Sequence, residues 1–198
     1  MVAQNRRREL RDAAIKAIAA DGYSAVTVAS ICEVAGFSRG LIGHYFKGKE
    51  DLLVEAIAGV ASELGDSMRR AVEAAGSDPL DRLHAVIRAS FTPPGFTKDK
   101  VAVWVALVGN AKWSPPLAKI YQDLWRDYRR GIAGLMRRAA DNRGQNFDFE
   151  RAALTFSQLI EGFWVGWGVD PKAVNRREAQ AACHAFLDLL FGETAAKR

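Results

Sequence analysis

The sequence contains few of the residues that usually build metal sites, disulfides or acid–base machinery. Its 198 residues include only two cysteines and three histidines. Cys32 and Cys183 each lie within an apolar helical pattern, where a cysteine is usually a small buried hydrophobic residue. The histidines fall in separate predicted helices, and no serine–histidine–aspartate grouping, metal-ligand spacing, Walker loop or dinucleotide-binding glycine motif is present. We therefore predict that the chain is not an enzyme and that it uses no metal and no cofactor.

Long apolar segments are also missing from the chain. The longest uninterrupted run, from Val101 to Gly109, is far too short to span a bilayer, so we expect no membrane partner. The first residues are polar and rich in arginine, which is not the pattern of a secretory signal. We therefore expect a cytoplasmic protein.

Alternating strand patterns are absent, whereas apolar residues recur at helical spacing almost throughout. With 49% apolar residues the chain has ample material for a core. Capping residues, glycines and prolines divide the helical pattern into segments. We predict an all-α fold of about nine helices, at approximately 5–21, 28–35, 39–44, 48–75, 79–92, 115–141 and 149–168, with a sixth helix that begins after the cap Thr97 and a ninth that begins after the cap Asn175.

Positive charge is scarce except near the N-terminus. The formal charge of the whole chain is +5, yet residues 1–49 contain eight lysines or arginines against four acidic residues, whereas the remaining 149 residues contain 20 against 19. A basic surface of this kind is what neutralisation of DNA phosphates requires. Charge alone fits a solvated surface equally well, so the interpretation depends on what the basic segment contains.

That segment contains a predicted helix-turn-helix. Thr27 is a good N-cap for a short helix, and Gly36 ends it at a position suited to the left-handed conformation. Ser38 then caps a second, very short helix from Arg39 to His44. Two small helices joined by a tight turn are typical of the motif that places a recognition helix in the major groove of DNA. The coincidence of charge and motif favours sequence-specific binding to double-stranded DNA.

Candidate DNA contacts lie on and around the second of these helices. Arg39 is the best candidate for base readout, because a guanidinium can bond guanine O6 and N7 together; a surface salt bridge is the alternative. Gly40 and Gly43 would permit close approach to the duplex, although a loosely packed helix would also explain them. We place three arginines ahead of the body of the first helix, where they can reach the phosphates or the minor groove. The remaining candidates, mostly for phosphate contacts, are Thr27, Ser38, His44, Tyr45, Lys47, Lys49, Arg6, Arg7 and Arg8.

The N-terminal quarter of the chain resembles the TetR family of one-component bacterial regulators. The matching residues are Thr27-Val28, Ala35-Gly36-Phe37-Ser38, Gly43-His44-Tyr45-Phe46-Lys47 and Lys49-Glu50-Asp51-Leu52-Leu53. One departure is Gly48, where members often have serine or asparagine as a helix cap. The resemblance implies a DNA-binding domain over residues 1–50 and a helical effector-binding and dimerisation domain over 51–198. It implies a homodimeric repressor that binds a palindromic operator and is released by a small-molecule effector.

Later segments are similar to the choline-responsive, BetI-type members of the family. The matching residues are Ile42-Gly43-His44-Tyr45-Phe46, Ala102-Val103-Trp104, Pro115-Pro116-Leu117 and Leu159-Ile160-Glu161-Gly162-Phe163-Trp164. The similarity implies a quaternary ammonium effector such as choline or betaine aldehyde, which aromatic faces can bind. Core packing is the alternative role for each aromatic residue. The effector-site candidates are Phe91, Trp104, Trp113, Tyr121, Trp125, Glu161 and Trp164.

The last two predicted helices carry wide apolar faces. They could complete the core of a monomer, but a helix-turn-helix protein usually needs two-fold symmetry for specific binding. We therefore expect the two helices of each chain to form a four-helix dimer interface. Its candidate residues are Phe156, Leu159, Phe163, Trp167, Ala182, Phe186 and Leu190.

Two other functions remain compatible with the sequence. A helical protein-interaction module could use the basic N-terminal face to bind an acidic partner, and it would then ignore competitor DNA. A TetR-like regulator could instead respond to an unrelated hydrophobic or drug-like effector. The sequence does not decide between repressor and activator, and it does not identify the operator.

Overall fold

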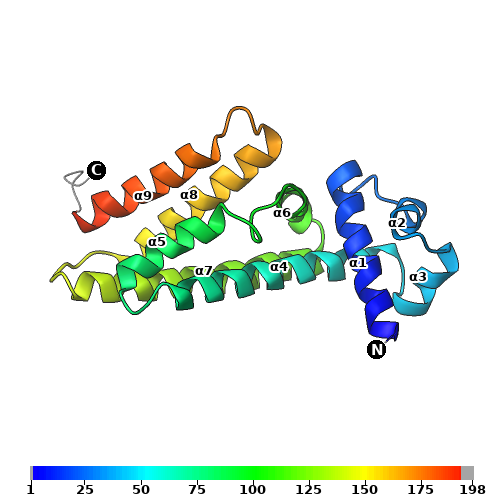
Figure 1. The fold of residues 1–198 in the computed structure, drawn as a ribbon, viewed down its shortest axis with the longest axis horizontal. Coiled ribbons are helices and arrows are strands. Elements are labelled where there is room, and N and C mark those ends of the chain that lie inside the picture. The colour runs from blue at the N-terminus through cyan, green and yellow to red at the C-terminus, as the bar shows by residue number, and fades with distance from the viewer. Residues whose placement is uncertain (1, 193–198) are drawn as a thin grey trace. The chain divides into compact units, whose positions relative to one another are not determined.

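The computed structural model describes residues 2–192, and within that range it contains nine helices and no strand (Figure 1). The prediction of an all-α chain is confirmed. No helix in the described range is long and apolar enough to cross a membrane. The helices are α1 (Val2–Asp21), α2 (Val28–Ala35), α3 (Arg39–Tyr45), α4 (Lys49–Ala74), α5 (Pro79–Ser90), α6 (Lys98–Ala111), α7 (Pro115–Asp141), α8 (Phe149–Val169) and α9 (Arg176–Phe191).

Local capping chemistry explains most of these boundaries. Thr27 forms a reciprocal capping box with Ser30, in which each hydroxyl accepts from the backbone N–H of the other residue at 3.0 Å. Gly36 ends α2 with a φ of 69°, in the left-handed region that glycine adopts without strain. Asp78 caps α5 by accepting from the backbone N–H groups of Leu80 and Asp81.

Two predictions at helix starts were wrong. Helix α1 begins at Val2, so the three arginines near the N-terminus lie inside the helix and not ahead of it. Ser38 occupies the N-cap position of α3, but its side chain makes no capping hydrogen bond. The fold therefore does not use the Ser38 hydroxyl.

The chain forms two compact units. The first comprises residues up to Glu63 together with Thr97–Gln122, and the second comprises Leu64–Phe96 together with the described residues after Gln122. In the first unit α1 packs against both α2 and α6. Its fully buried side chains include Leu10, Ile31, Leu52, Leu53 and Ile57.

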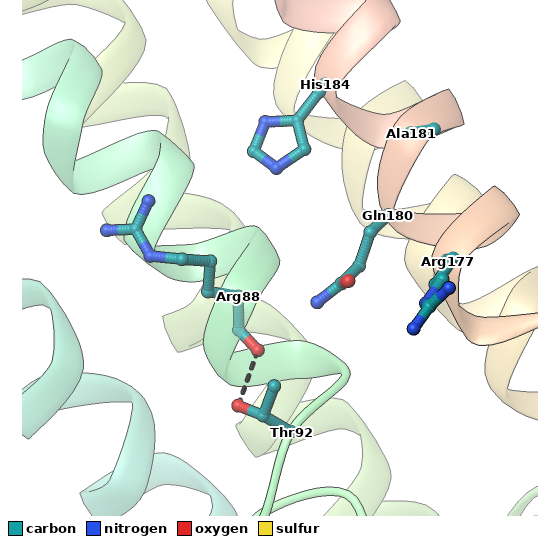
Figure 2. A pocket seen from close by; sticks show the side chains of 6 residues that line it. All are labelled: Arg88, Thr92, Arg177, Gln180, Ala181 and His184. Carbon is teal, nitrogen blue, oxygen red and sulfur yellow. Dashed lines mark hydrogen bonds between the residues drawn. The ribbon is translucent and has the colours of Figure 1, made fainter.

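The second unit has its core among α5, α8 and α9. Helix α9 packs against both α5 and α8, and the most buried residues include Leu83, Ile87, Phe156 and Leu187. Cys183 is buried here as a free thiol, and burial raises its pKa to about 12. A hollow remains open between α5 and α9 (Figure 2).

Candidate DNA-binding site and effector region

Helix α3 presents a polar face to solvent. Its apolar side is anchored by Ile42 and, just after its end, by Phe46, which are 3% and 4% exposed. Arg39 is exposed at the first position of the helix and forms no ion pair with any described carboxylate. The salt-bridge alternative for Arg39 therefore has no partner within residues 2–192. The guanidinium is held at the exposed start of a helix whose opposite side is fixed in the core.

Two glycines leave part of the exposed face of α3 without side chains. A Cβ built on Gly40 or Gly43 would meet no atom within 4 Å, so packing within the chain does not require a glycine at either position. Glycine in a helix interior costs about 1 kcal/mol relative to alanine. A surface free of side chains at these positions lets another molecule approach the backbone of α3 closely. His44 is exposed on the same helix and Tyr45 is half-buried at its end.

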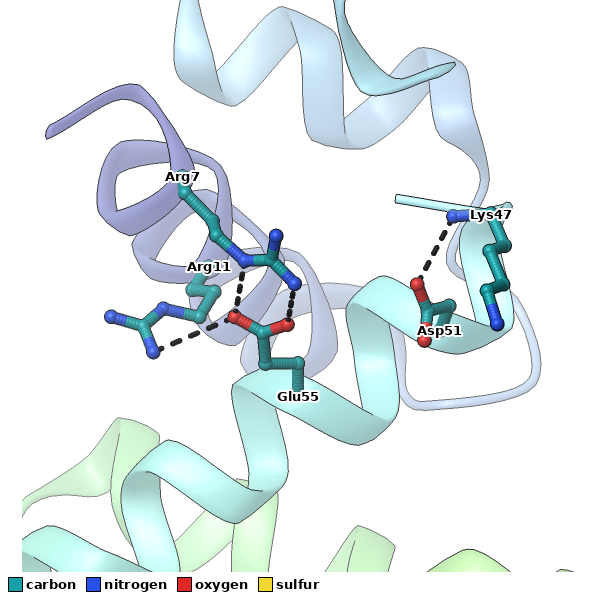
Figure 3. Close-up of polar contacts among 5 residues, drawn as sticks. All are labelled: Arg7, Arg11, Lys47, Asp51 and Glu55. Carbon is teal, nitrogen blue, oxygen red and sulfur yellow. Dashed lines mark hydrogen bonds and ion pairs between the residues drawn. The ribbon is translucent and has the colours of Figure 1, made fainter. Parts of the chain in front are cut away.

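The arginines of α1 differ in their roles (Figure 3). Arg7 forms an ion pair with Glu55 on α4, with Arg7 Nε donating to Glu55 Oε1 at 2.8 Å and Nη2 donating to Oε2. Arg11 lies 3.7 Å from the same carboxylate. The Arg7 guanidinium also lies over the Phe46 ring, 4.8 Å from its centroid. This arrangement joins α1 to α4 and engages the Arg7 guanidinium within the chain, while the Arg7 side chain stays 45% exposed.

The two arginines that flank Arg7 make fewer contacts within the chain. Arg6 donates to Glu9 at 2.7 Å and lies 4.8 Å from the centroid of Phe37, whereas exposed Arg8 forms no ion pair with a described residue.

Hydrogen bonding from Arg7 lowers the pKa of Glu55. The charges of Arg7 and Arg11 lower it further, whereas the partial burial of Glu55 opposes the shift. The same pairing raises the pKa of Arg7.

The two lysines after α3 also separate into different roles. Lys49 Nζ donates to the carbonyl oxygen of Val26 at 2.9 Å, which ties the start of α4 to the segment before α2. The prediction that Lys49 clamps a phosphate is therefore not supported by its position. The Lys47 side chain is exposed, while its backbone N–H donates to Asp51 Oδ2 at 3.0 Å (Figure 3). Thr27 is exposed, but its hydroxyl is engaged with Ser30.

Aromatic side chains of the second unit converge around Phe96. Its ring centroid lies 5.2 Å from that of Trp164, 4.8 Å from that of Trp167 and 5.8 Å from that of Phe91. Trp164 is fixed by its indole N–H, which donates to the carbonyl oxygen of Ser90 at 2.8 Å. The structure therefore brings together Phe91 and Trp164, two of the predicted effector-site residues.

A buried carboxylate lies one helical turn before Trp164. Glu161 is 8% exposed, and its Oε2 accepts from Gln158 Nε2 at 2.9 Å. Burial of a carboxylate is costly unless hydrogen bonds or a positive charge compensate it. Glu161 and Trp164 lie on the same face of α8 because they are spaced i and i+3 along the helix.

The other predicted aromatic residues are distributed between the two units. In the first unit Trp104 lies 5.9 Å from Tyr121 between ring centroids. Trp113 is 77% exposed, with the Lys112 ammonium 4.8 Å from its ring centroid, so it belongs to neither buried cluster. In the second unit Trp125 is buried and packs against Tyr128 at 5.3 Å.

Sequence reasoning missed Phe96 and Tyr128. Phe96 immediately precedes Thr97, the N-cap of α6, and an apolar residue at that position was a detectable signal of a hydrophobic staple. The Tyr128 hydroxyl is buried, and this burial raises its pKa against a smaller opposing contribution from the Ser90 side chain. Helical periodicity does not single out Tyr128, because a tyrosine on the apolar face of a helix usually packs in the core.

The predicted dimer residues are more buried within the chain than expected. Phe156 is fully buried and stacks on Phe186 with centroids 5.9 Å apart, so it belongs to the core of the unit and the prediction for it was wrong. Partly buried positions are Leu159, Phe163, Trp167, Ala182, Phe186 and Leu190. The large apolar side chains that α8 and α9 expose are Leu154, Val169 and Leu189.

Comparisons with known proteins agree with this architecture. The chain matches the family model for bacterial regulatory proteins of the tetR family over residues 10–56 and the model for the C-terminal part of BetI-type transcriptional repressors over residues 79–192. It is 32% identical to the HTH-type transcriptional regulator BetI of Rhizobium meliloti, over 81% of this chain and 76% of the relative. It is 29% identical to the regulator of the same name from Brucella canis, over 97% and 95% of the two chains.

Solved structures share the fold. A transcriptional regulator from Pseudomonas aeruginosa PAO1 superposes with a TM-score of 0.83 at 28% identity, over 96% of this chain and 91% of that one. A regulator from Saccharomonospora viridis in complex with choline superposes with a TM-score of 0.85 at 22% identity, over 93% and 96%. The matched proteins are transcriptional regulators and not enzymes. The chain belongs to the TetR family of bacterial transcriptional regulators and has a C-terminal domain of the BetI type.

Proposed function

We propose that the protein is a homodimeric repressor that binds a palindromic operator and leaves it when a small quaternary ammonium ion binds the C-terminal domain. The single observation that best supports operator reading is Arg39, which is exposed at the start of α3 and has no described carboxylate partner. Two α3 helices related by a two-fold axis would enter successive major grooves on one side of the duplex. Action on chromosomal operators would take place in the cytoplasm.

The DNA contacts that we propose divide into three groups. Arg39 reads bases, and the side-chain-free face at Gly40 and Gly43 allows α3 to lie close to the duplex. Phosphates are bound by side chains that form no ion pair with a described residue, or only a weak one at the surface. Arg7 and Lys49 act indirectly, by fixing α1 and the start of α4. The proposed phosphate-contacting residues are Ser38, His44, Tyr45, Lys47, Arg6 and Arg8, with Thr27 requiring rearrangement of its bond to Ser30.

The effector site that we propose lies at the aromatic cluster around Phe96. Quaternary ammonium ions have no N–H to donate and are held over aromatic faces, at about 2 kcal/mol or more for a desolvated contact. Trp164 and its neighbours provide such faces, and Glu161 supplies a buried negative charge on the same helix. The related fold from Saccharomonospora viridis was solved with choline bound, which supports this ligand class.

A covalent connection links this cluster to the DNA-binding unit. Phe96 is followed directly by Thr97, whose hydroxyl accepts from the Lys100 backbone N–H and caps α6. Helix α6 in turn packs against α1. A ligand that displaces the Phe96 ring would therefore move the start of α6, and differential affinity for two such arrangements would couple effector and operator binding.

The dimer contact that we propose uses the outward faces of α8 and α9. Leu154, Val169 and Leu189 are exposed by 46%, 73% and 86%, so their side chains are available to pack against a second copy of the chain. Partly buried residues such as Leu159 and Ala182 would extend this surface. The two helices from each of two chains would form a four-helix bundle.

Selection of bound fragments from the source organism's genome, followed by gel shifts, tests the proposal. We expect a palindromic site, and we expect millimolar choline to lower the affinity for it while leaving weak binding to random DNA unchanged. Equal affinity for all fragments would contradict operator reading. A palindromic site whose binding is insensitive to choline and betaine aldehyde would contradict only the effector assignment.

A further inference from the structure

A basic hollow in the second unit lies between α5 and α9 (Figure 2). Its volume is about 570 Å³, which is within the range of small-molecule sites. No carboxylate lines it, although acidic residues make up almost half of the charged residues of the chain. The lining residues are Arg88, Thr92, Arg177, Gln180, Ala181 and His184.

Two guanidinium groups give this hollow its charge. Arg88 comes from the last turn of α5 and Arg177 from the first turn of α9. Both are exposed, and neither forms an ion pair with a described carboxylate. Their charges are therefore not neutralised within the part of the chain that the structure describes.

His184 contributes a third nitrogen-bearing group, and its ring is held in place. Its Nδ1 lies 2.8 Å from Nδ1 of His84 on α5, and the two rings stack with centroids 4.9 Å apart. Such a contact needs a proton on one Nδ1 and a lone pair on the other. In Figure 2 the other ring nitrogen of His184 points toward the space between Gln180 and Arg88. The pairing thus orients the ring toward the hollow.

A third arginine lies near the same end of α5. Arg88 and Thr92 also line a second hollow of about 440 Å³, which Arg70 of α4 borders and whose other lining residues include five alanines and two prolines. Arg70 also forms no ion pair with a described carboxylate. Three arginines therefore surround the C-terminal half of α5 without a described acidic partner.

From these observations we propose that the hollow between α5 and α9 binds the anionic group of a small metabolite, with a phosphate monoester as the best match. Planar guanidinium groups bind phosphate and carboxylate oxygens through paired N–H bonds. Two of them carry enough charge to balance a phosphate monoester. In Figure 2 the Arg88 guanidinium points away from α9, so a phosphate shared with Arg177 requires the Arg88 side chain to turn toward the hollow, where Gln180 can donate a further hydrogen bond. This anion site goes beyond the proposed function and differs in charge from the cation site around Phe96.

Calorimetry on the full-length protein without DNA tests the proposal. The probes are inorganic phosphate and glycerol 3-phosphate, with acetate and succinate as carboxylate probes. We expect saturable heat from the two phosphates. Arg88→Gln and Arg177→Gln should each weaken binding about tenfold or more, because each removes a charge-assisted contact.

Arg138→Gln is the matched control, because it removes the same charge at an exposed position in the last turn of α7, outside the lining set, where Arg138 forms no ion pair with a described carboxylate. It should leave phosphate affinity unchanged, and circular dichroism should show all three variants folded. His184→Gln, which retains a donor, should weaken binding less than either arginine variant. Saturable heat from carboxylates alone would replace phosphate by carboxylate as the ligand chemistry. No saturable heat from any probe, or equal losses in Arg138→Gln and Arg177→Gln, would overturn the site, and operator binding would be unaffected by that result.

Discussion

Arg7 on α1 and Glu55 on α4 form a two-pronged ion pair across 48 residues of sequence, with Arg7 Nε 2.8 Å from Glu55 Oε1. The guanidinium simultaneously covers the Phe46 ring. Phe46 follows α3 directly, so this pair fixes the helix that we propose to read DNA. We therefore propose that Arg7 affects DNA binding through the position of α3.

The Arg7–Glu55 pair predicts a specific pH dependence of stability. Hydrogen bonding from Arg7 holds the pKa of Glu55 below its ordinary value of 4.5. The stabilisation is therefore present above about pH 4.5 and lost as the pH falls through the lowered pKa. We expect the melting temperature of the wild type to fall more steeply between pH 5 and pH 3 than that of Glu55→Gln. The contribution is small because both side chains are partly exposed, and parallel curves for the two proteins would contradict it.

The glycines of α3 predict opposite effects on stability and on DNA binding. Gly40→Ala and Gly43→Ala should each stabilise the fold by up to about 1 kcal/mol, since the new methyl group meets nothing within 4 Å and alanine favours helix. Operator affinity should fall, because the methyl groups would lie between α3 and the duplex. Thermal melts and gel shifts on the same preparations measure both effects. Gly59→Ala on α4, where a Cβ also meets nothing within 4 Å, is the control and should leave operator binding unchanged. Unchanged operator affinity in both α3 variants would show that the duplex does not approach this face.

Local chemistry explains which parts of the fold were predictable. The Thr27 cap, the left-handed Gly36 and the Asp78-Pro79 start of α5 are encoded within a few residues, and the structure has each helix boundary there. The roles of Arg7 and Lys49 were not predictable in this way. Their partners, Glu55 and the Val26 carbonyl, are distant in sequence, and helical spacing contains no information about them.

A similar limit applies to the apolar faces of α8 and α9. Periodicity identifies a wide apolar stripe on each helix, but the packing of α9 on α8 decides which residues of the stripe are buried within the chain. Phe156 is among the buried residues, whereas Leu189 is exposed. For the same reason, periodicity could not distinguish the aromatic residues around Phe96 from ordinary core residues.

Arg39 and Lys47 should affect DNA binding in different ways. Arg39→Ala should cost about 1–3 kcal/mol of operator binding and relax the preference at one base position, because the guanidinium reads base edges. Lys47→Ala should weaken binding to all sequences equally and reduce the salt slope by about 1, as expected for one phosphate contact. Fluorescence anisotropy with operator and random duplexes at several salt concentrations separates the two effects. If Arg39→Ala lowers both affinities equally, Arg39 contacts phosphate and not a base.

Glu161 should control the response to a cationic effector. Glu161→Gln keeps an oxygen that can accept from Gln158 but removes the buried negative charge. We expect about tenfold more choline to be needed for operator release, because the variant loses the charge opposite the ammonium group. Glu150→Gln, at an exposed position in the first turn of α8, should respond like the wild type. Equal choline sensitivity in all three proteins would remove Glu161 from the effector site.

Leu189 and Phe156 distinguish a dimer surface from the core of one chain. Leu189 is 86% exposed, so Leu189→Glu should leave the chain folded while placing a charge in the proposed four-helix contact. Analytical ultracentrifugation should then show monomers, and operator affinity should drop because one α3 helix buries too little surface for tight binding. Phe156→Ala should instead cost about 3–5 kcal/mol of folding stability, since it leaves a cavity in the core. A dimer that persists in Leu189→Glu at wild-type strength would place the contact elsewhere, because a buried unpaired carboxylate cannot be accommodated without loss of affinity.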